Sequence, residues 1–430
     1  MVPSSQSGSF PLESLVKEPS LIAGRRLAAG LGAIVDFAET DEHRALRTAV
    51  AAIARDFGPR YYAEHAARRE PCQELWQALG RAGFLGVNIP EEYGGGGGGL
   101  VELEIVCEEI AAEGTPLLLL LVSSAISAEV IAEFGTDDQK KRWLPGLADG
   151  TSKVVFAITE PDAGSNTHKL STTAVRDGGD WLLSGTKYYI SGVEESDAVL
   201  VVARTPATTD DSKTDDSRTP LDNSKTRLSL FVVPTDAPGF DKRILPVDLM
   251  LPERQYTLHF DQVRLPAEAL VGTAGDGFRQ VFHGLNPERI TGAALGVGIA
   301  RHVLTQASRY AAGRQIWSAP MGALQGVSHP LAKAKIETEL AALMTRQAAW
   351  QHDHGQPAGE ASNMAKYAAA EAALAACDAA IQTHGGNGVA TEYGLIPYWG
   401  LARLLRIAPV NREMILNYVA QHSLGLPRSY

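Results

Sequence analysis

Cysteine is scarce in this chain and is not arranged as a disulfide framework. Only Cys72, Cys107 and Cys377 occur among 430 residues, far apart and with no CxxC pair. Small secreted domains that depend on disulfides carry many closely spaced cysteines. The three residues are therefore expected to be reduced side chains of the core.

Long apolar runs and excess positive charge are missing as well. The richest apolar run, Leu117–Val122, falls far short of the roughly 20 residues that span a membrane. Residues 1–10 lack the charged and then apolar order of a secretory signal. The net charge of −11 would repel a nucleic-acid backbone. We expect a cytoplasmic protein with no membrane span and no nucleic-acid partner.

The remaining sequence divides into four stretches by its periodicity. Residues 1–40 have weak periodicity and form an expected N-terminal extension, whereas residues 41–152 are helical in pattern. Residues 153–273 hold short β-type runs, and residues 274–430 return to helical periodicity. Between two of the β-type runs, residues 205–227 are crowded with polar side chains and are expected to form a surface loop. The β-type runs are Val154–Ile158, Trp181–Leu183, Ala198–Val202, Leu228–Val233 and Tyr256–Phe260.

Two motifs in the β-type region could contact a flat polar ligand. Phe156–Asn166 is a strand followed by a Pro/Gly turn that exposes hydroxyl and N–H groups. Ser184–Gly192 alternates aromatic residues with a hydroxyl, as covering a cofactor ring would require. Taken alone, each is equally typical of a strand end or a half-buried strand.

Two further motifs lie in the C-terminal helical region. Arg309–Trp317 ends a helix and places Arg314 where its donors could bind a diphosphate, with Gln325 following. Gln382–Gly388 is a Gly-rich turn after a long helix, where backbone could approach a ligand closely. The alternatives are a solvated helix end and a helix C-cap, although a cap explains only one of the glycines.

In their order and spacing, these motifs resemble the acyl-CoA dehydrogenase family over residues 40–427. The resemblance implies an α+β fold with a helical N-terminal domain, a central β-barrel-like domain and a C-terminal four-helix bundle, assembled as a homodimer or homotetramer. The matching stretches are Ile158–Ser165, Gly185–Ser191, Leu258–Pro266, Leu270–Gly272, Gly275–Phe278, Arg314–Gln325 and Gln382–Gly388.

The resemblance also implies FAD-dependent α,β-dehydrogenation of an acyl-CoA, with an electron-transfer flavoprotein as electron acceptor. By residue, Thr159 matches the position that holds the flavin pyrimidine edge, and Ser191 matches the hydroxyl at flavin N5. Tyr189 stands where an aromatic residue, commonly tryptophan, covers the ring, and Ser165 matches a position near the phosphates.

A second group of positions matches residues that a neighbouring subunit offers to the FAD diphosphate. In relatives, an arginine and a glutamine contact the diphosphate and a glycine turn lies beside it. Trp317 departs from the usual phenylalanine, so the site is expected to be slightly altered. The positions are Arg314, Trp317, Gln325, Gln382, Gly385 and Gly386.

The base that removes the α proton is displaced from its commonest place. Most relatives carry a glutamate near the C-terminus, where this chain has Pro409, which cannot accept a proton. Branches that act on branched or long acyl chains carry the base on another helix, directly before an arginine. Glu288, followed by Arg289, is therefore the candidate base, and Glu413 is the runner-up.

Helix capping offers a different explanation of Glu288. Asn286 is a good N-cap, Pro287 a favoured first helical residue, and a glutamate next to them would complement the helix dipole. Two other functions also stay open on the same scaffold: a flavin monooxygenase or oxidase, and a paralogue without a base that only binds acyl-CoA. These motifs set neither the length of the acyl chain of the substrate nor whether that chain is attached to CoA or to a carrier protein.

Four smaller features have ordinary interpretations. Glu160 is a third carboxylate in the expected flavin region, but its role in the motif is structural. The glycine run 94–99 lacks the ending of a phosphate-binding loop and is expected to connect two helices. His352–His354 has no third ligand and is expected to be polar surface rather than a metal site. Leu404 replaces an acid common in relatives, which removes an expected ion pair.

Overall fold

The structure is a computed structural model that describes residues 39–206 and 226–428. The expected N-terminal extension and most of the polar insert 205–227 lie outside these residues. The described residues from Asp41 onward form one compact unit by their contacts. In the described part, no helix is long and apolar enough to cross a membrane, and no cluster of three metal-ligating side chains occurs. All three cysteines are free and buried, which confirms their core positions.

In the described residues, five α-helices and one π-helical segment precede the sheet, with α3 buried among them. The glycine run before α3 is a loop, as expected, and the carboxylate of Asp353 caps the helix. Its Oδ1 accepts from Leu100 N at 2.7 Å and its Oδ2 from Val101 N at 2.9 Å. Residues 352–354 therefore lie at the end of a second helix, and their aspartate caps α3. They are not a polar loop. The segments are α1 (Asp41–Arg68), α2 (Gln73–Arg81), α3 (Leu100–Ala112), the π-helical η3 (Leu120–Ser127), α4 (Ala128–Phe134) and α5 (Asp137–Asp149).

The middle of the chain forms an eight-stranded sheet. Its order is β6-β7-β3-β2-β4-β5-β8, and β1 pairs with β4 in parallel. Among the described strands β6 and β8 are the two ends, and no pairing joins them into a closed barrel. The five expected β-type runs are confirmed, while β2, β6 and β8 were missed. The strands are β1 (Val154–Ala157), β2 (Thr173–Asp177), β3 (Asp180–Ser191), β4 (Ala198–Pro206), β5 (Thr226–Pro234), β6 (Phe240–Leu245), β7 (Gln255–Leu265) and β8 (Leu270–Val271).

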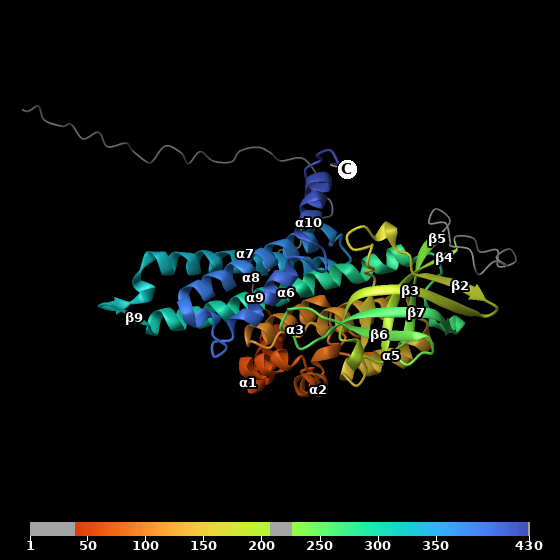
Figure 1. Ribbon diagram of the computed structural model, residues 1–430, viewed down its shortest axis with the longest axis horizontal. Coiled ribbons are helices and arrows are strands. Elements are labelled where there is room, and N and C mark those ends of the chain that lie inside the picture. Colours follow the sequence, from red (N-terminus) through yellow and green to blue (C-terminus); the bar gives the residue numbers. More distant parts are fainter. Residues whose placement is uncertain (1–38, 207–225, 429–430) are drawn as a thin grey trace, which may run out of the picture. The chain divides into compact units, whose positions relative to one another are not determined.

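Helices return after the sheet and pack along one another (Figure 1). Helix α6 contacts α7, α8 and α9, and it also reaches α3, η3 and β5, so it joins all three parts of the fold. A short hairpin of β9 (Gln315–Ile316) and β10 (Ala319–Pro320) connects α6 to α7. The helices are α6 (Gly277–Gly313), α7 (Gln325–Asp353), α8 (Gly359–His384), η9 (Gly385–Val389), α9 (Leu395–Leu405) and α10 (Arg412–Tyr418).

Two glycines let α6 approach its neighbours closely. A Cβ at Gly298 would lie 2.3 Å from the carbonyl oxygen of Glu108 on α3, which is a clash with backbone. A Cβ at Gly296 would lie 3.2 Å from the carbonyl oxygen of Ala369 on α8, which is tighter than an ordinary contact. Helix α6 can therefore lie directly against α3 only because it has a glycine, with no side chain, at the point of contact.

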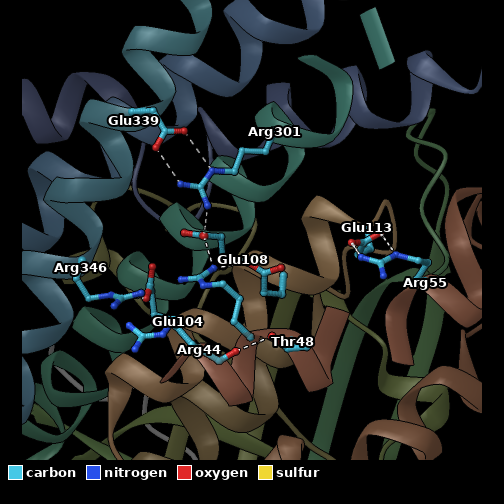
Figure 2. A network of polar contacts seen from close by, with 11 residues as sticks. Arg44, Thr48, Arg55, Glu104, Glu108, Glu113, Arg301, Glu339 and Arg346 are labelled. Carbon is cyan, nitrogen blue, oxygen red and sulfur yellow. Dashed lines mark hydrogen bonds and ion pairs between the residues drawn. The ribbon is translucent and has the colours of Figure 1, made fainter. Parts of the chain in front are cut away.

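A network of charged side chains ties α1, α3, α6 and α7 together beside this contact (Figure 2). Glu108 is buried; its Oε1 accepts from Arg47 Nη1 at 2.6 Å and also pairs with Arg301. Arg301 in turn reaches Glu339 on α7 with an Nη2–Oε2 distance of 3.1 Å. Because Glu108 is almost fully buried, its arginines must stay in place to offset the loss of hydration.

The network predicts that removing one or the other of its carboxylates lowers the stability of the protein by different amounts. We expect Glu108→Ala to destabilise the protein by about 3 kcal/mol, because Arg47 and Arg301 both lose the buried carboxylate that they share. The matched change Glu339→Ala, at a side chain 43% exposed, should cost less than about 1 kcal/mol. Urea unfolding of both variants measures the difference. Equal losses would contradict the central position of Glu108.

Candidate active site

Glu160 closes the turn that follows β1. Its carboxylate accepts hydrogen bonds from Ser171 N at 2.6 Å and Thr172 N at 3.0 Å, and it pairs with Lys187 Nζ at 2.8 Å. Burial by itself raises the pKa of Glu160, but Lys187 and the hydrogen-bond donors outweigh burial and lower the pKa to about 2. All its lone pairs are engaged in holding the loop, so Glu160 is structural and not a base.

A bulge in β3 lies beside this turn and exposes an aromatic residue. The pairing of β3 with β7 shifts register between Lys187 and Ile190. Tyr189, inside the bulge, has a φ of 58° and is 55% exposed. A bulky residue rarely adopts this backbone conformation without a functional reason. Tyr188 N donates to Thr159 O at 2.9 Å, which holds the end of β1 against the bulge.

The last residue of β3, Ser191, has a hydrogen-bond partner that was not foreseen from sequence. Gln255, the first residue of β7, lies directly across from it, and Gln255 Nε2 donates to Ser191 Oγ at 2.9 Å. Thr159, Tyr189 and Ser191 are thus gathered at one end of β1 and β3. Ser165, on the loop after β1, is exposed, and its Oγ accepts from Asn411 Nδ2 at 2.8 Å.

The other expected ligand-binding positions gather at a different end of the protein. Arg314 caps α6, Gln325 begins α7 and Gln382 lies in the last turn of α8, all of them exposed. Gln382 also lines a surface groove of about 450 Å³ between α7 and α8. Gly385, with a φ of 59°, and the exposed Gly386 follow as the expected turn.

Trp317 lies at the tip of the hairpin in this second group. It is 91% exposed with a φ of 51°. In Figure 1 the hairpin, marked by β9, is far from β3. Within the described residues, no hydrogen bond or ion pair links this group to Thr159, Tyr189 or Ser191. One chain therefore presents two separate halves of the expected cofactor site.

Glu288 lies inside a helix and not at its start. Helix α6 begins at Gly277, so Asn286 and Pro287 are interior residues, and the capping interpretation of this glutamate is wrong. The side chain of Asn286 accepts from Arg289 Nη1 at 2.9 Å instead of capping a backbone N–H. A proline in a helix interior removes a backbone hydrogen bond and destabilises the helix. Local helix signals therefore do not account for a carboxylate here.

The surroundings of Glu288 suit a proton acceptor. The residue is half-buried, and burial raises its pKa to about 7, although Arg289 and Lys366 act in the opposite direction. A carboxylate with such a pKa is partly ionised near neutral pH and can both accept and release a proton. Groups of this kind are characteristic of active sites.

The C-terminal segment that carries Pro409 lies close to the same part of α6. A Cβ at Gly292, one helical turn after Glu288, would lie 4.0 Å from Pro409 Cδ. Lys366 on α8, which influences Glu288, donates from Nζ to Val410 O. The two positions considered for a base, Glu288 and Pro409, thus lie on neighbouring segments, and only Glu288 is a carboxylate.

Glu413 does not share this environment. Its side chain is 72% exposed and lies 3.8 Å from Arg412 Nη1, at the start of α10. Near Leu404, Arg406 Nε lies 2.6 Å from Glu371 Oε1. The exposed Glu413 therefore lacks the burial that a general base requires.

The fold and the site correspond to a known family of enzymes. Models of the acyl-CoA dehydrogenase N-terminal, middle and C-terminal domains match residues 40–151, 155–263 and 275–424. The chain therefore belongs to the acyl-CoA dehydrogenase family. It is an oxidoreductase, and the activity of its family is the FAD-dependent dehydrogenation of acyl-CoA.

Individual relatives cover nearly the whole chain. Acyl-CoA dehydrogenase FadE12 of Mycobacterium tuberculosis (strain ATCC 25618 / H37Rv) is 55% identical over 92% of this chain and 99% of its own length. The mitochondrial long-chain specific acyl-CoA dehydrogenase of Sus scrofa is 30% identical over 89% and 86%. The structure of butyryl-CoA dehydrogenase from Megasphaera elsdenii, 26% identical, superposes with a TM-score of 0.82 over 90% and 100%.

The Glu160 geometry predicts a pH-dependent contribution to stability. Its pKa is about 2 when folded against 4.5 when unperturbed, so the unfolded state binds the proton more tightly. The stabilisation is present above about pH 5 and is lost as the pH falls toward 2. We expect the stability gap between wild type and Glu160→Gln, from urea unfolding, to shrink over this range. A gap that stays constant would contradict the ionised pair, and the exposed change Glu413→Gln should open no gap.

Proposed function

We propose that this chain oxidises an acyl-CoA thioester between its α and β carbons with Glu288 as the catalytic base. The observation that carries the proposal is a half-buried carboxylate with a pKa raised to about 7, one helical turn from the residue that faces Pro409. Glu288 accepts the α proton, the α and β carbons form a double bond, and the β hydrogen leaves as hydride.

The residues of this chain fit FAD as the hydride acceptor. Tyr189 is an exposed aromatic residue held in a strained conformation, as a residue covering a flat ring would be. Two residues with hydroxyls lie nearby in the fold: Thr159, whose carbonyl accepts from Tyr188 N, and Ser191, the last residue of β3. When bound, FAD supplies the acceptor for the β hydride. Ser165 follows on the same loop, toward the expected phosphates.

A second copy of the chain completes this cofactor site. Arg314 and Gln325 flank the β9–β10 hairpin, which lies far from β3 in Figure 1. A second subunit would therefore bring these residues to Tyr189. Helix α7 also carries an apolar stripe at helical spacing, and its members are 62%, 62% and 55% exposed: Ile336, Leu340 and Leu343. Exposed apolar stripes of this kind mark interfaces. A homodimer or homotetramer would cover the stripe and bring the two halves together.

The remaining assignments follow from this chemistry. Each turnover reduces FAD, so an electron acceptor is required, and an electron-transfer flavoprotein is proposed for that role. On the same basis, we propose that the chain divides into domains at 41–152, 153–273 and 274–430. A cytoplasmic location and a place in fatty acid metabolism are proposed as well. The burial of Glu288 argues against a paralogue without a base, and no contact within the described residues favours a monooxygenase or oxidase.

Replacing the base should separate cofactor binding from chemistry. We expect Glu288→Gln to retain FAD but to reduce it with acyl-CoA about 10²- to 10⁴-fold more slowly, since general-base catalysis contributes on this scale. The matched control Glu413→Gln should reduce FAD at the wild-type rate. Anaerobic stopped-flow absorbance measures both. Loss of reduction in Glu413→Gln alone would reverse the assignment.

The raised pKa of Glu288 predicts the pH profile. Because only the ionised carboxylate accepts a proton, kcat/KM should rise with pH through about 7 and level off above it. Below that value it should fall about tenfold per pH unit. A profile that stays flat down to pH 5 would contradict a buried base.

The shared cofactor site predicts complementation between inactive variants. Glu288→Gln and Arg314→Ala homo-oligomers should both be inactive. In a mixed pair, one site keeps Glu288 from one subunit and Arg314 from the other. Co-refolding equal amounts should restore about a quarter of wild-type activity if dimers mix at random. No recovery, with mixed oligomers demonstrated by tagging, would show that Arg314 serves its own subunit.

A further inference from the structure

Ser191 and Gln255 form a cross-strand pair at the edge of the proposed flavin site. They are the last residue of β3 and the first of β7, aligned directly opposite each other. Both polar atoms of the Gln255 amide bond to the hydroxyl: Nε2 donates to Ser191 Oγ at 2.9 Å, and Ser191 Oγ donates to Oε1 at 3.1 Å. Gln255 is 7% exposed and Ser191 half-buried, so water has little access to the pair.

The chain directly before Gln255 is held firmly. Gly192 N donates to Arg254 O at 3.0 Å, directly after Ser191. Glu253, buried two residues before Gln255, accepts from Leu118 N at 2.9 Å through Oε1. The start of β7 is thus tied both to β3 and to the segment that leads into η3. The Gln255 amide consequently stays at one place relative to the Ser191 hydroxyl.

A second feature prevents the pair from shifting. A Cβ at Gly192 would lie 2.6 Å from Leu119 Cδ2, so the chain after Ser191 is pressed against the segment that Glu253 holds. Gly192 has a φ of 68°, which favours glycine here. The position of Ser191 is therefore set by its neighbours, and only the rotation of its hydroxyl is left to Gln255.

The amide decides where the hydroxyl hydrogen points. A serine hydroxyl donates one hydrogen bond and accepts up to two. When Gln255 N–H occupies one lone pair, the hydroxyl hydrogen can turn either to Gln255 Oε1 or to an acceptor on the opposite side. We propose that Gln255 is a positioning residue, which holds Ser191 as a hydrogen-bond donor toward a ring nitrogen of FAD. This inference rests on the proposed function.

Substitutions at Gln255 distinguish this role from simple packing. Gln255→Met keeps the length of the side chain but neither donates nor accepts. Gln255→Glu keeps its shape, but an ionised carboxylate only accepts and would draw the hydroxyl hydrogen to itself. Gln262→Met, on the same strand at an exposed position, is the matched control. Each variant is purified with FAD, and its visible absorption spectrum, flavin midpoint potential and rate of reduction by acyl-CoA are measured.

The expected results form a double-mutant cycle with Ser191→Ala. Gln255→Met should shift the flavin spectrum and potential in the same direction as Ser191→Ala and slow reduction roughly 5- to 10-fold, the scale of one hydrogen bond. Gln255→Glu should slow reduction further. Both effects of Gln255→Met should disappear in the Ser191→Ala background. The Gln262→Met control should match wild type.

The outcomes that overturn the inference differ from those that overturn the function. If Ser191→Ala alters the flavin but Gln255→Met and Gln255→Glu do not, the positioning role is wrong while the function stands. If the effect of Gln255→Met persists unchanged in the Ser191→Ala background, the positioning role is also wrong while the function stands. Wild-type protein that binds no FAD would overturn the proposed function and this inference together.

Discussion

Helix α6 can lie against α3 only because Gly298 has no side chain to meet the carbonyl of Glu108. This contact brings Arg301, one turn further along α6, to the buried carboxylate of Glu108. The same helix carries Glu288 at its other end and reaches the sheet through β5. Its position therefore sets the distance between the candidate base and the strands that carry the proposed flavin contacts.

Electrostatics at Glu288 depend on the same packing. Burial on α6 raises the pKa of the carboxylate to about 7, while Arg289 and Lys366 keep it from rising further. Lys366 also holds Val410, beside the proline that occupies the other possible place for a base. Because Gly292 faces Pro409, a carboxylate on either element would reach the same region. The proposed chemistry would thus keep its location although the candidate base lies on a different helix.

Local patterns predicted the most buried elements well. Strands such as β4 and helices such as α8 have many buried apolar residues, and these are visible as a pattern in the sequence. Strand β6 was missed because most of its side chains are exposed, which leaves no alternation to detect. Asn286 and Pro287 imitate a helix start, yet α6 continues through them. Tertiary contacts override the local signal: a Cβ at Gly284 would lie only 2.9 Å from Val130 Cγ2.

Contacts between residues that are far apart in the chain could not be predicted from the sequence. Gln255 faces Ser191 only through the pairing of β3 with β7, and nothing in its own neighbourhood marks it as a functional residue. The burial of Glu288 and the exposure of Glu413 likewise follow from packing between α6, α8 and the C-terminal segment. Motif order was sufficient to name the candidates, and packing was needed to rank them.

Exchange of the substrate α proton with solvent tests the base without requiring hydride transfer. Acyl-CoA would be incubated anaerobically in D₂O with enzyme whose FAD has already been reduced, and deuterium at the α carbon followed by NMR. The account predicts exchange with wild type and Glu413→Gln and almost none with Glu288→Gln, whose amide cannot accept the proton. Exchange at the wild-type rate in Glu288→Gln would show that another group is the base.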